Sequence, residues 1–236
     1  MRVTVWGTRG SYPVCRSNVV RYGGNSTCFS IESQGQELIV DGGTGIVPLG
    51  RHLTRQYPQG RQLSLFLTHS HWDHVLGYPY FGPFYDRRFH IDIYGADSEN
   101  RTLDDVFSQQ YSQENFPVPF QDLGSHLRIH RIGHGSRINL GSIAVHATQL
   151  NHPGMDLGYR FSSGQGDVVI LTDLAPIEDN YLGQGMAEIA KERPRSFELD
   201  YVHGLTELIR GADLVIYDTN FTEEEIEGKR HWGHST

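Results

Sequence analysis

Cysteine is scarce in this sequence, and so are long apolar runs. Only Cys15 and Cys28 occur among 236 residues, too few for a disulfide framework in a chain of this size, so a reducing compartment is expected. No apolar run approaches the ~20 residues that a membrane-spanning helix needs. Residues 1–13 alternate like a strand and do not resemble a leader peptide. We therefore expect a soluble, cytoplasmic protein without a membrane partner.

Positive charge is also in short supply. The chain has 20 Lys and Arg against 28 Asp and Glu, a formal net charge of -8, and its longest basic runs are the pairs Arg87-Arg88 and Lys229-Arg230. Proteins that bind long nucleic acids through their phosphates need a basic surface. The charge balance therefore argues against a long nucleic acid as partner. Histidine, by contrast, is abundant, with 13 residues.

The chain is long enough for a substantial core, and no linker, repeat or low-complexity tract divides it. We expect a single domain over residues 1–236. Its β-branched and aromatic runs predict strands at 2–6, 27–31, 37–40, 63–67, 89–94, 127–132, 142–148, 159–162, 168–171 and 214–217. Helices are predicted at 46–57, 102–111, 197–210 and 223–228, the last with Thr222 as N-cap, whereas 177–194 is the most loop-like stretch. This order predicts an α/β fold with helices packed outside sheets.

Four of the predicted strands end in ionisable residues. Asp41 follows "ELIV", the cluster from His69 to His74 follows "LSLFLT", Asp173 follows "VVILT", and Asp218 follows "DLVIY". Polar groups just past the ends of buried strands are a usual layout for a site at one edge of a sheet. Several strands are therefore expected to contribute to one site.

The strongest local signal is the string "HSHWDH" from His69 to His74, which is too dense in histidine and aspartate to expect by chance. Neutral imidazoles and carboxylates are ligands for Zn, Mn or Fe. A tight turn after a strand can direct alternate residues to one point and the following pair to a second point nearby. The string therefore favours two metal ions over one.

These residues resemble those of the metallo-β-lactamase fold hydrolases, and most of all the branch of tRNase Z and bacterial cyclic-nucleotide phosphodiesterases. The similar segments span nearly the whole chain: "GTRGSYPV", "RYGGNSTC", "VDGGTG", "THSHWDH", "NHPG", "LTDLA", "ADLVIYDTNFT" and "GHST". The resemblance implies a four-layer αββα sandwich, a binuclear metal site holding Zn, with Mn or Fe as alternatives, and the ability to form a homodimer. The ligands it implies are His69, His71 and His152 for the first metal, Asp73 and His74 for the second, and Asp173 between the two.

The resemblance assigns further roles outside the ligand set. Asp41 corresponds to an acidic residue that supports the ligands from behind, Asp73 also orients the attacking water, and Asp218 and His234 form a proton-donating pair. Four of these positions have alternative explanations. His152 precedes Pro153 and could open a turn, with His146 as the competing ligand; Asp173 could cap the next segment, and Asp41 and Asp218 could be turn residues.

The function implied is phosphodiester hydrolysis, catalysed by Asp73, Asp218 and His234. No Lys/Arg- and Gly-rich arm comparable to that of the tRNA enzymes is present, and the chain is acidic, so a small substrate such as a cyclic nucleotide is expected. Two alternatives stay open: a metal-dependent ester, thioester or lactam hydrolase, and a metal-binding sensor without turnover. The family normally continues past "GHST" with elements that deliver one more histidine. The resemblance therefore also predicts a C-terminally truncated chain, for which His231 is a weak substitute ligand.

Overall fold

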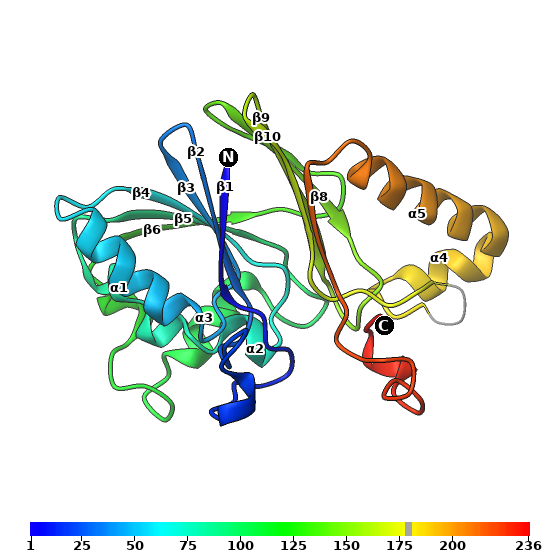
Figure 1. Cartoon of the computed structure of the whole chain (residues 1–236), viewed down its shortest axis with the longest axis horizontal. Helices are drawn as coiled ribbons and strands as arrows, with labels where there is room; N and C mark the ends of the chain where they lie inside the picture. The colour runs from blue at the N-terminus through cyan, green and yellow to red at the C-terminus, as the bar shows by residue number, and fades with distance from the viewer. Residues whose placement is uncertain (178–180) are drawn as a thin grey trace. The chain divides into compact units, whose positions relative to one another are not determined.

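A computed structural model describes residues 1–177 and 181–236, with the backbone alone at residues 194 and 195. The chain forms two compact units. The first comprises residues 1–95 and 101–131, and the second residues 96–100 and 132–236. Each unit contains one mixed β-sheet with helices beside it (Figure 1). The predicted α/β class is therefore confirmed, and each unit is described separately below.

The first unit holds a six-stranded sheet in sequence order, β1-β2-β3-β4-β5-β6. The pairs β1–β2 and β2–β3 are antiparallel, whereas β3–β4, β4–β5 and β5–β6 are parallel. Parallel neighbours need crossover connections, which are supplied here by α1, by the short turns around α2, and by α3. The elements are β1 (Arg2–Gly7), β2 (Cys28–Ser33), β3 (Gln36–Val40), α1 (Ile46–Gln56), β4 (Gln62–Phe66), α2 (Trp72–Val75), β5 (His90–Gly95), α3 (Leu103–Gln110) and β6 (His126–Arg131).

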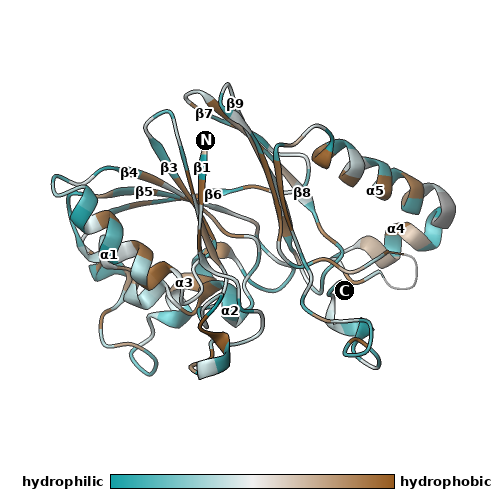
Figure 2. Cartoon of the chain, viewed as in Figure 1, coloured by the Kyte–Doolittle hydropathy of each residue, from teal (hydrophilic) through white to brown (hydrophobic). Residues whose placement is uncertain are grey.

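The core of the first unit lies between its sheet and the helices α1 and α3. Leu49 and Leu53 of α1 pack with alternate strand residues such as Leu65 and Ile93, and with Phe107 of α3. Figure 2 shows both hydrophilic and hydrophobic turns along the α1 ribbon, as expected of a helix that buries only one face. This packing fixes the loops that leave the carboxyl ends of β3 and β4.

The second unit holds a five-stranded sheet in the order β11-β10-β9-β8-β7. Strands β7 to β10 form an antiparallel meander, and β11 returns parallel to β10 after two helices. Leu205 and Leu208 of α5 pack on Val169 and Leu171 of β10. The elements are β7 (Arg137–Leu140), β8 (Ile143–Gln149), β9 (Leu157–Ser163), β10 (Gly166–Leu171), α4 (Met186–Glu192), α5 (Pro194–Ile209) and β11 (Leu214–Tyr217).

All ten predicted strands and the three longer predicted helices are confirmed. The prediction missed β7, a four-residue strand at the sheet edge with only two apolar residues, and α4, which lies in the stretch predicted to be a loop. Of that stretch, residues 178–180 lie outside the described part of the chain.

The helix predicted at 223–228 is wrong. Thr222 and Glu225 do form the reciprocal bonds of a capping box, and Ile226 N donates to Thr222 O over 3.0 Å. The helix ends after a single turn because Gly228, with a φ of +76°, adopts a left-handed conformation. In the described part of the chain, no helix combines the length and the apolar character needed to cross a bilayer.

Candidate metal and acid-base site

Parallel pairing brings the predicted site residues together in each unit. In the first unit β3 and β4 are hydrogen-bonded parallel neighbours, so Asp41 and the His69–His74 string leave the same edge of the sheet. In the second unit β10 and β11 are parallel neighbours, so Asp173 and Asp218 also leave one edge together. Each unit therefore brings two of the four predicted strand ends to one edge of its own sheet.

Asp41 is the centre of a buried hydrogen-bond network in the first unit. Its side chain is fully buried and accepts a hydrogen bond from Thr68 N at 2.8 Å, while Nδ1 of His74 lies 2.8 Å from Oδ2. Burial raises the pKa of the Asp41 carboxyl, and His74 opposes that rise. Asp41 also has a φ of +63°, so it is a turn residue and a partner of His74 at once. An imidazole held this way at Nδ1 presents Nε2 to a metal.

Gly43, two residues after Asp41, is required by steric contacts. A Cβ atom at Gly43 would stand 2.2 Å from the carbonyl oxygen of Asp73. Only glycine therefore lets the loop after β3 approach the loop that carries the histidine string. This close approach explains "VDGGTG" as a packing requirement of the site.

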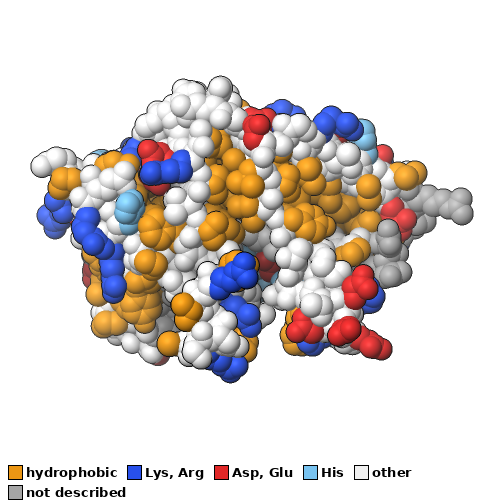
Figure 3. All heavy atoms as spheres, in the orientation of Figure 1, with side chains coloured by type: hydrophobic (Ala, Val, Ile, Leu, Met, Phe, Trp, Pro, Cys, Tyr) orange, Lys and Arg blue, Asp and Glu red, His pale blue; other side chains and the backbone are white. Residues whose placement is uncertain are grey.

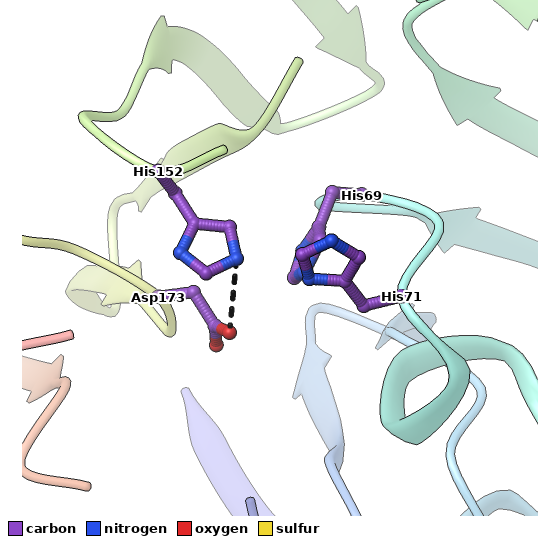
Figure 4. A group of neighbouring side chains, drawn as sticks. All are labelled: His69, His71, His152 and Asp173. Atoms are coloured by element: carbon purple, nitrogen blue, oxygen red, sulfur yellow. Dashed lines mark ion pairs between the residues drawn. The ribbon is translucent and has the colours of Figure 1, made fainter. Parts of the chain in front are cut away.

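The histidine string folds into a compact turn in the first unit. His69 and His74 are buried, whereas His71, just before α2, is exposed. The His69 ring centroid lies 4.4 Å from that of His71 and 4.2 Å from that of His74, and Figure 4 draws His69 and His71. Imidazoles this close repel one another when protonated. The donor set therefore suits a divalent metal held by neutral imidazoles and carboxylates.

Asp73 belongs to the same turn. Its Oδ2 atom accepts a hydrogen bond from Ser11 N at 2.7 Å and lies 3.5 Å from Nε2 of His74. The pair Asp73 and His74, predicted as ligands of a second metal, therefore presents a carboxylate oxygen and an imidazole nitrogen side by side.

In the second unit, His152 faces Asp173. His152 is 1% exposed, and its Nε2 atom lies 3.6 Å from Oδ2 of Asp173 (Figure 4). Its Nδ1 atom is 2.7 Å from the carbonyl oxygen of Gly233, which fixes Nδ1 as the donor and leaves the ring's lone pair on Nε2, as a metal ligand requires. The residue after His152 is Pro153, but the position does more than open a turn.

His146, the competing ligand, has different neighbours. It lies on β8 with Arg137 of β7 and Arg160 of β9 as its cross-strand partners. Partial burial and these arginines lower the pKa of His146. Its position among cations on the sheet favours His152, which lies beside Asp173.

Asp218 and His234 form a hydrogen-bonded pair in the second unit. His234 Nδ1 lies 2.8 Å from Asp218 Oδ2 and 3.8 Å from Asp173 Oδ2. Asp218 accepts further hydrogen bonds from Leu174 N and Asn220 N, each at 2.9 Å. Burial raises the pKa of Asp218, and His234 opposes the rise. Asp218 therefore both shapes its turn and orients His234.

Three contributors to the site were not foreseen from the sequence. Thr68 places its hydroxyl 3.0 Å from Asp41 Oδ2 and 3.1 Å from His69 Nδ1. Asn151 donates to the carbonyls of Ala175 and Pro176, and so connects the loop after β8 with the loop after β10. Gly233 acts through its carbonyl, which no side-chain pattern reveals. The sequence signal that could have identified Thr68 and Asn151 is their position directly before His69 and His152, in "LTH" and "LNH".

Comparison with known proteins places the chain in a family. A sequence profile of the "Beta-lactamase superfamily domain" matches residues 36–190, more than half of the chain. Ribonuclease Z of Natronomonas pharaonis is 23% identical over 265 residues, covering 100% of this chain and 80% of that protein.

Two solved structures share the fold. The short form of human tRNase Z has a TM-score of 0.66 at 18% identity, with 100% of this chain and 85% of that chain covered. Unliganded yeast PDE1 has a TM-score of 0.55 at 14% identity, with 98% of this chain and 78% of that chain covered.

The predicted fold and the prediction of a metal-dependent hydrolase are confirmed at the level of the family. His and Asp residues of the metal-binding type stand at the strand ends of both units, as that family assignment requires. The chain therefore belongs to the β-lactamase superfamily, as a metallo-β-lactamase fold protein similar in sequence to ribonuclease Z and in fold to tRNase Z and yeast PDE1.

Proposed function

We propose that this protein is a binuclear metal-dependent phosphodiesterase acting on a small nucleotide substrate, in which residues 1–236 work as one hydrolase domain. The superfamily profile runs through both units, which supports a shared function. We assign His69, His71 and His152 to one divalent metal, Asp73 and His74 to a second, and Asp173 to both. Figure 4 draws the four candidate ligands of the first metal.

One observation carries the metal assignment. Three of the proposed ligand histidines have Nδ1 engaged by a neighbour in their own unit: His69 by Thr68, His74 by Asp41, and His152 by Gly233. Histidines that bind metal through Nε2 characteristically use the other ring nitrogen in this way, because the hydrogen bond fixes the tautomer and the ring orientation. Zn is the first expectation for such a His and Asp set, and Mn and Fe accept the same ligands.

The proposed acid-base chemistry uses Asp73 of the first unit and the pair Asp218 and His234 of the second. Divalent ions, when bound, supply Lewis acidity that neutralises phosphoryl charge and makes water more acidic. Asp73 then accepts a hydrogen bond from the attacking water and orients it. His234 donates the proton that the leaving alkoxide needs, and Asp218, 2.8 Å from its Nδ1, holds the ring in the donating orientation.

Charge supports a small substrate over a long RNA. The chain carries 28 acidic and 20 basic residues, a balance that weakens binding to a polyanion. The two free cysteines support a cytoplasmic site of action, where thiols stay reduced.

The deciding experiment couples metal analysis to hydrolysis of bis(p-nitrophenyl) phosphate by wild type, His71→Ala and His152→Ala. Wild type should bind two divalent ions per chain and hydrolyse the diester, and both variants should lose metal and activity. His146→Ala is the matched control, because His146 lies among arginines on β8, and it should keep both properties. Unchanged metal content in His71→Ala would refute the ligand assignment.

Two further substrates separate the remaining hypotheses. Turnover of a thioester or a lactam in preference to the diester would indicate a different hydrolase of this fold. Metal binding without turnover of any of the three would indicate a sensor module.

A further inference from the structure

The segment before His234 carries an aromatic and cationic cluster that the catalytic proposal does not use. It consists of Phe221, Lys229 and Trp232, all in the second unit. The Phe221 ring meets the His234 ring edge-on at 5.7 Å between centroids, and it meets the Trp232 ring edge-on at 6.2 Å. The cluster therefore begins in direct contact with the proposed proton donor.

Lys229 places its ammonium group over both rings. Its Nζ atom lies 4.7 Å from the centroid of Phe221 and 5.9 Å from that of Trp232. Among the described residues, no carboxylate forms an ion pair with Lys229. The ammonium therefore keeps hydrogen-bond donors for a ligand.

The outer ring of the cluster is accessible. Trp232 is 50% exposed, although tryptophan usually buries most of its surface. The backbone holds it in place: Trp232 N donates to Lys229 O over 2.8 Å, and Phe221 N donates to Ser235 O over 3.4 Å. An exposed, fixed indole is a flat surface on which another aromatic group can stack.

Negative charge around the cluster limits the ligand's size. Figure 3 shows Asp and Glu side chains over the loop that Figure 1 draws in red. Four exposed glutamates stand there, at positions 223, 224, 225 and 227. A long phosphate backbone would be repelled on this side, whereas a single uncharged nucleobase would not.

We infer that Trp232, Phe221 and Lys229 form the nucleobase subsite of the proposed phosphodiesterase, with the base stacked on Trp232 and Lys229 donating to its oxygen or nitrogen acceptors. The inference rests on the proposed function and deepens it, because it makes the substrate a nucleotide of about one unit. The contact between Phe221 and His234 places the base next to the group that protonates the leaving oxygen.

The test compares two esters with the same leaving group, using the metal-loaded full chain. Thymidine 5′-monophosphate p-nitrophenyl ester carries a nucleobase, and methyl p-nitrophenyl phosphate does not. Base stacking on an aromatic side chain predicts that Trp232→Leu lowers the ratio of the two kcat/KM values by about 5- to 100-fold, mainly through KM. Trp232→Phe should keep most of the ratio, and Lys229→Gln should lower it.

Tyr22→Leu is the matched control. Tyr22 is 76% exposed and carries the Arg21 guanidinium 5.1 Å from its ring centroid, but it belongs to the first unit. Its removal should leave the ratio unchanged.

The outcomes separate the two proposals. If wild type hydrolyses neither ester, the phosphodiesterase proposal fails, and equilibrium dialysis of thymidine 5′-monophosphate against wild type and Trp232→Leu still decides the subsite. If both esters are hydrolysed and the ratio is unchanged in Trp232→Leu and Lys229→Gln, the cluster only packs the segment and the inference is overturned. Preferred cleavage of a tRNA-length RNA, unaffected by Trp232→Leu, would also overturn it. Should Trp232→Leu fail to fold, Lys229→Gln and Trp232→Phe decide.

Discussion

Gly233→Ala tests whether the closing "GHST" segment positions a metal ligand. Gly233 has a φ of +90°, and a Cβ atom there would stand 2.3 Å from Pro153 Cδ and 2.5 Å from His152 Nδ1. Both distances are far inside van der Waals contact. The new methyl group must therefore displace the His152 ring or break its 2.7 Å hydrogen bond to the Gly233 carbonyl.

Two costs add at this position. A left-handed backbone costs a residue other than glycine roughly 1–2 kcal/mol, and forced overpacking costs about 1–3 kcal/mol more. Loss of a hydrogen bond that orients a ligand histidine typically lowers metal affinity by ~10- to 100-fold. Gly233→Ala should therefore lose stability and metal affinity together.

Gly228→Ala separates the two effects. Gly228 has a φ of +76°, but a Cβ atom there would meet nothing within 4 Å. This variant should show the backbone cost without the loss of metal. Zinc titration against a chromophoric chelator, with thermal unfolding in parallel, measures both quantities. Equal metal affinity in the two alanine variants would refute the role of Gly233 in holding His152.

Three further predictions concern the first unit and the metals. Burial raises the pKa of Glu37 from 4.5 to about 7. Because the folded protein binds this proton more tightly than the unfolded chain, the protonated carboxyl contributes its full share of the folding free energy below pH 4.5. This contribution is lost as the pH rises through 7, by up to ~3 kcal/mol. Urea unfolding of Glu37→Gln should therefore show a flatter pH dependence than wild type between pH 5 and 8, and an equal slope would contradict this. Asp41→Asn should weaken metal binding by about 10- to 100-fold because His74 loses its carboxylate partner, whereas Asp92→Asn, which breaks a similar 2.7 Å contact with a partly exposed histidine, should not. Removing the metal with a chelator should lower the free energy of unfolding of wild type by about 4 kcal/mol if the free metal concentration was 1,000 times the Kd. The melting temperature of His71→Ala should fall less on chelation.

The sequence determined the fold class and the residue types of the site. Short runs of β-branched and aromatic residues were sufficient to predict ten strands, because residues that a sheet buries are apolar in the local sequence. The string from His69 to His74 specified metal chemistry, since its donors are adjacent in sequence. Asp41, Asp173 and Asp218 were identifiable because each lies within two residues of the end of an apolar strand.

Local sequence patterns gave a wrong secondary structure at strand β7 and at residues 223–228. Strand β7 has only two apolar residues and exists because it pairs with β8. The segment at 223–228 has a helix-start signal at Thr222, yet the left-handed backbone at Gly228 ends it after one turn. At β7 the pairing with a neighbouring strand decided the outcome, and at 223–228 the stop signal at Gly228 outweighed the start signal at Thr222.

Only the tertiary structure decided which atoms orient the proposed ligands. Asp41 reaches His74 across 33 positions of sequence, and the carbonyl of Gly233 reaches His152 across 81. These contacts depend on parallel pairing of β3 with β4 in one unit and on the return of the C-terminal segment to His152 in the other. The sequence identifies which residues carry the candidate metal-binding atoms. Their ring orientation depends on partners that only folding brings within hydrogen-bond distance.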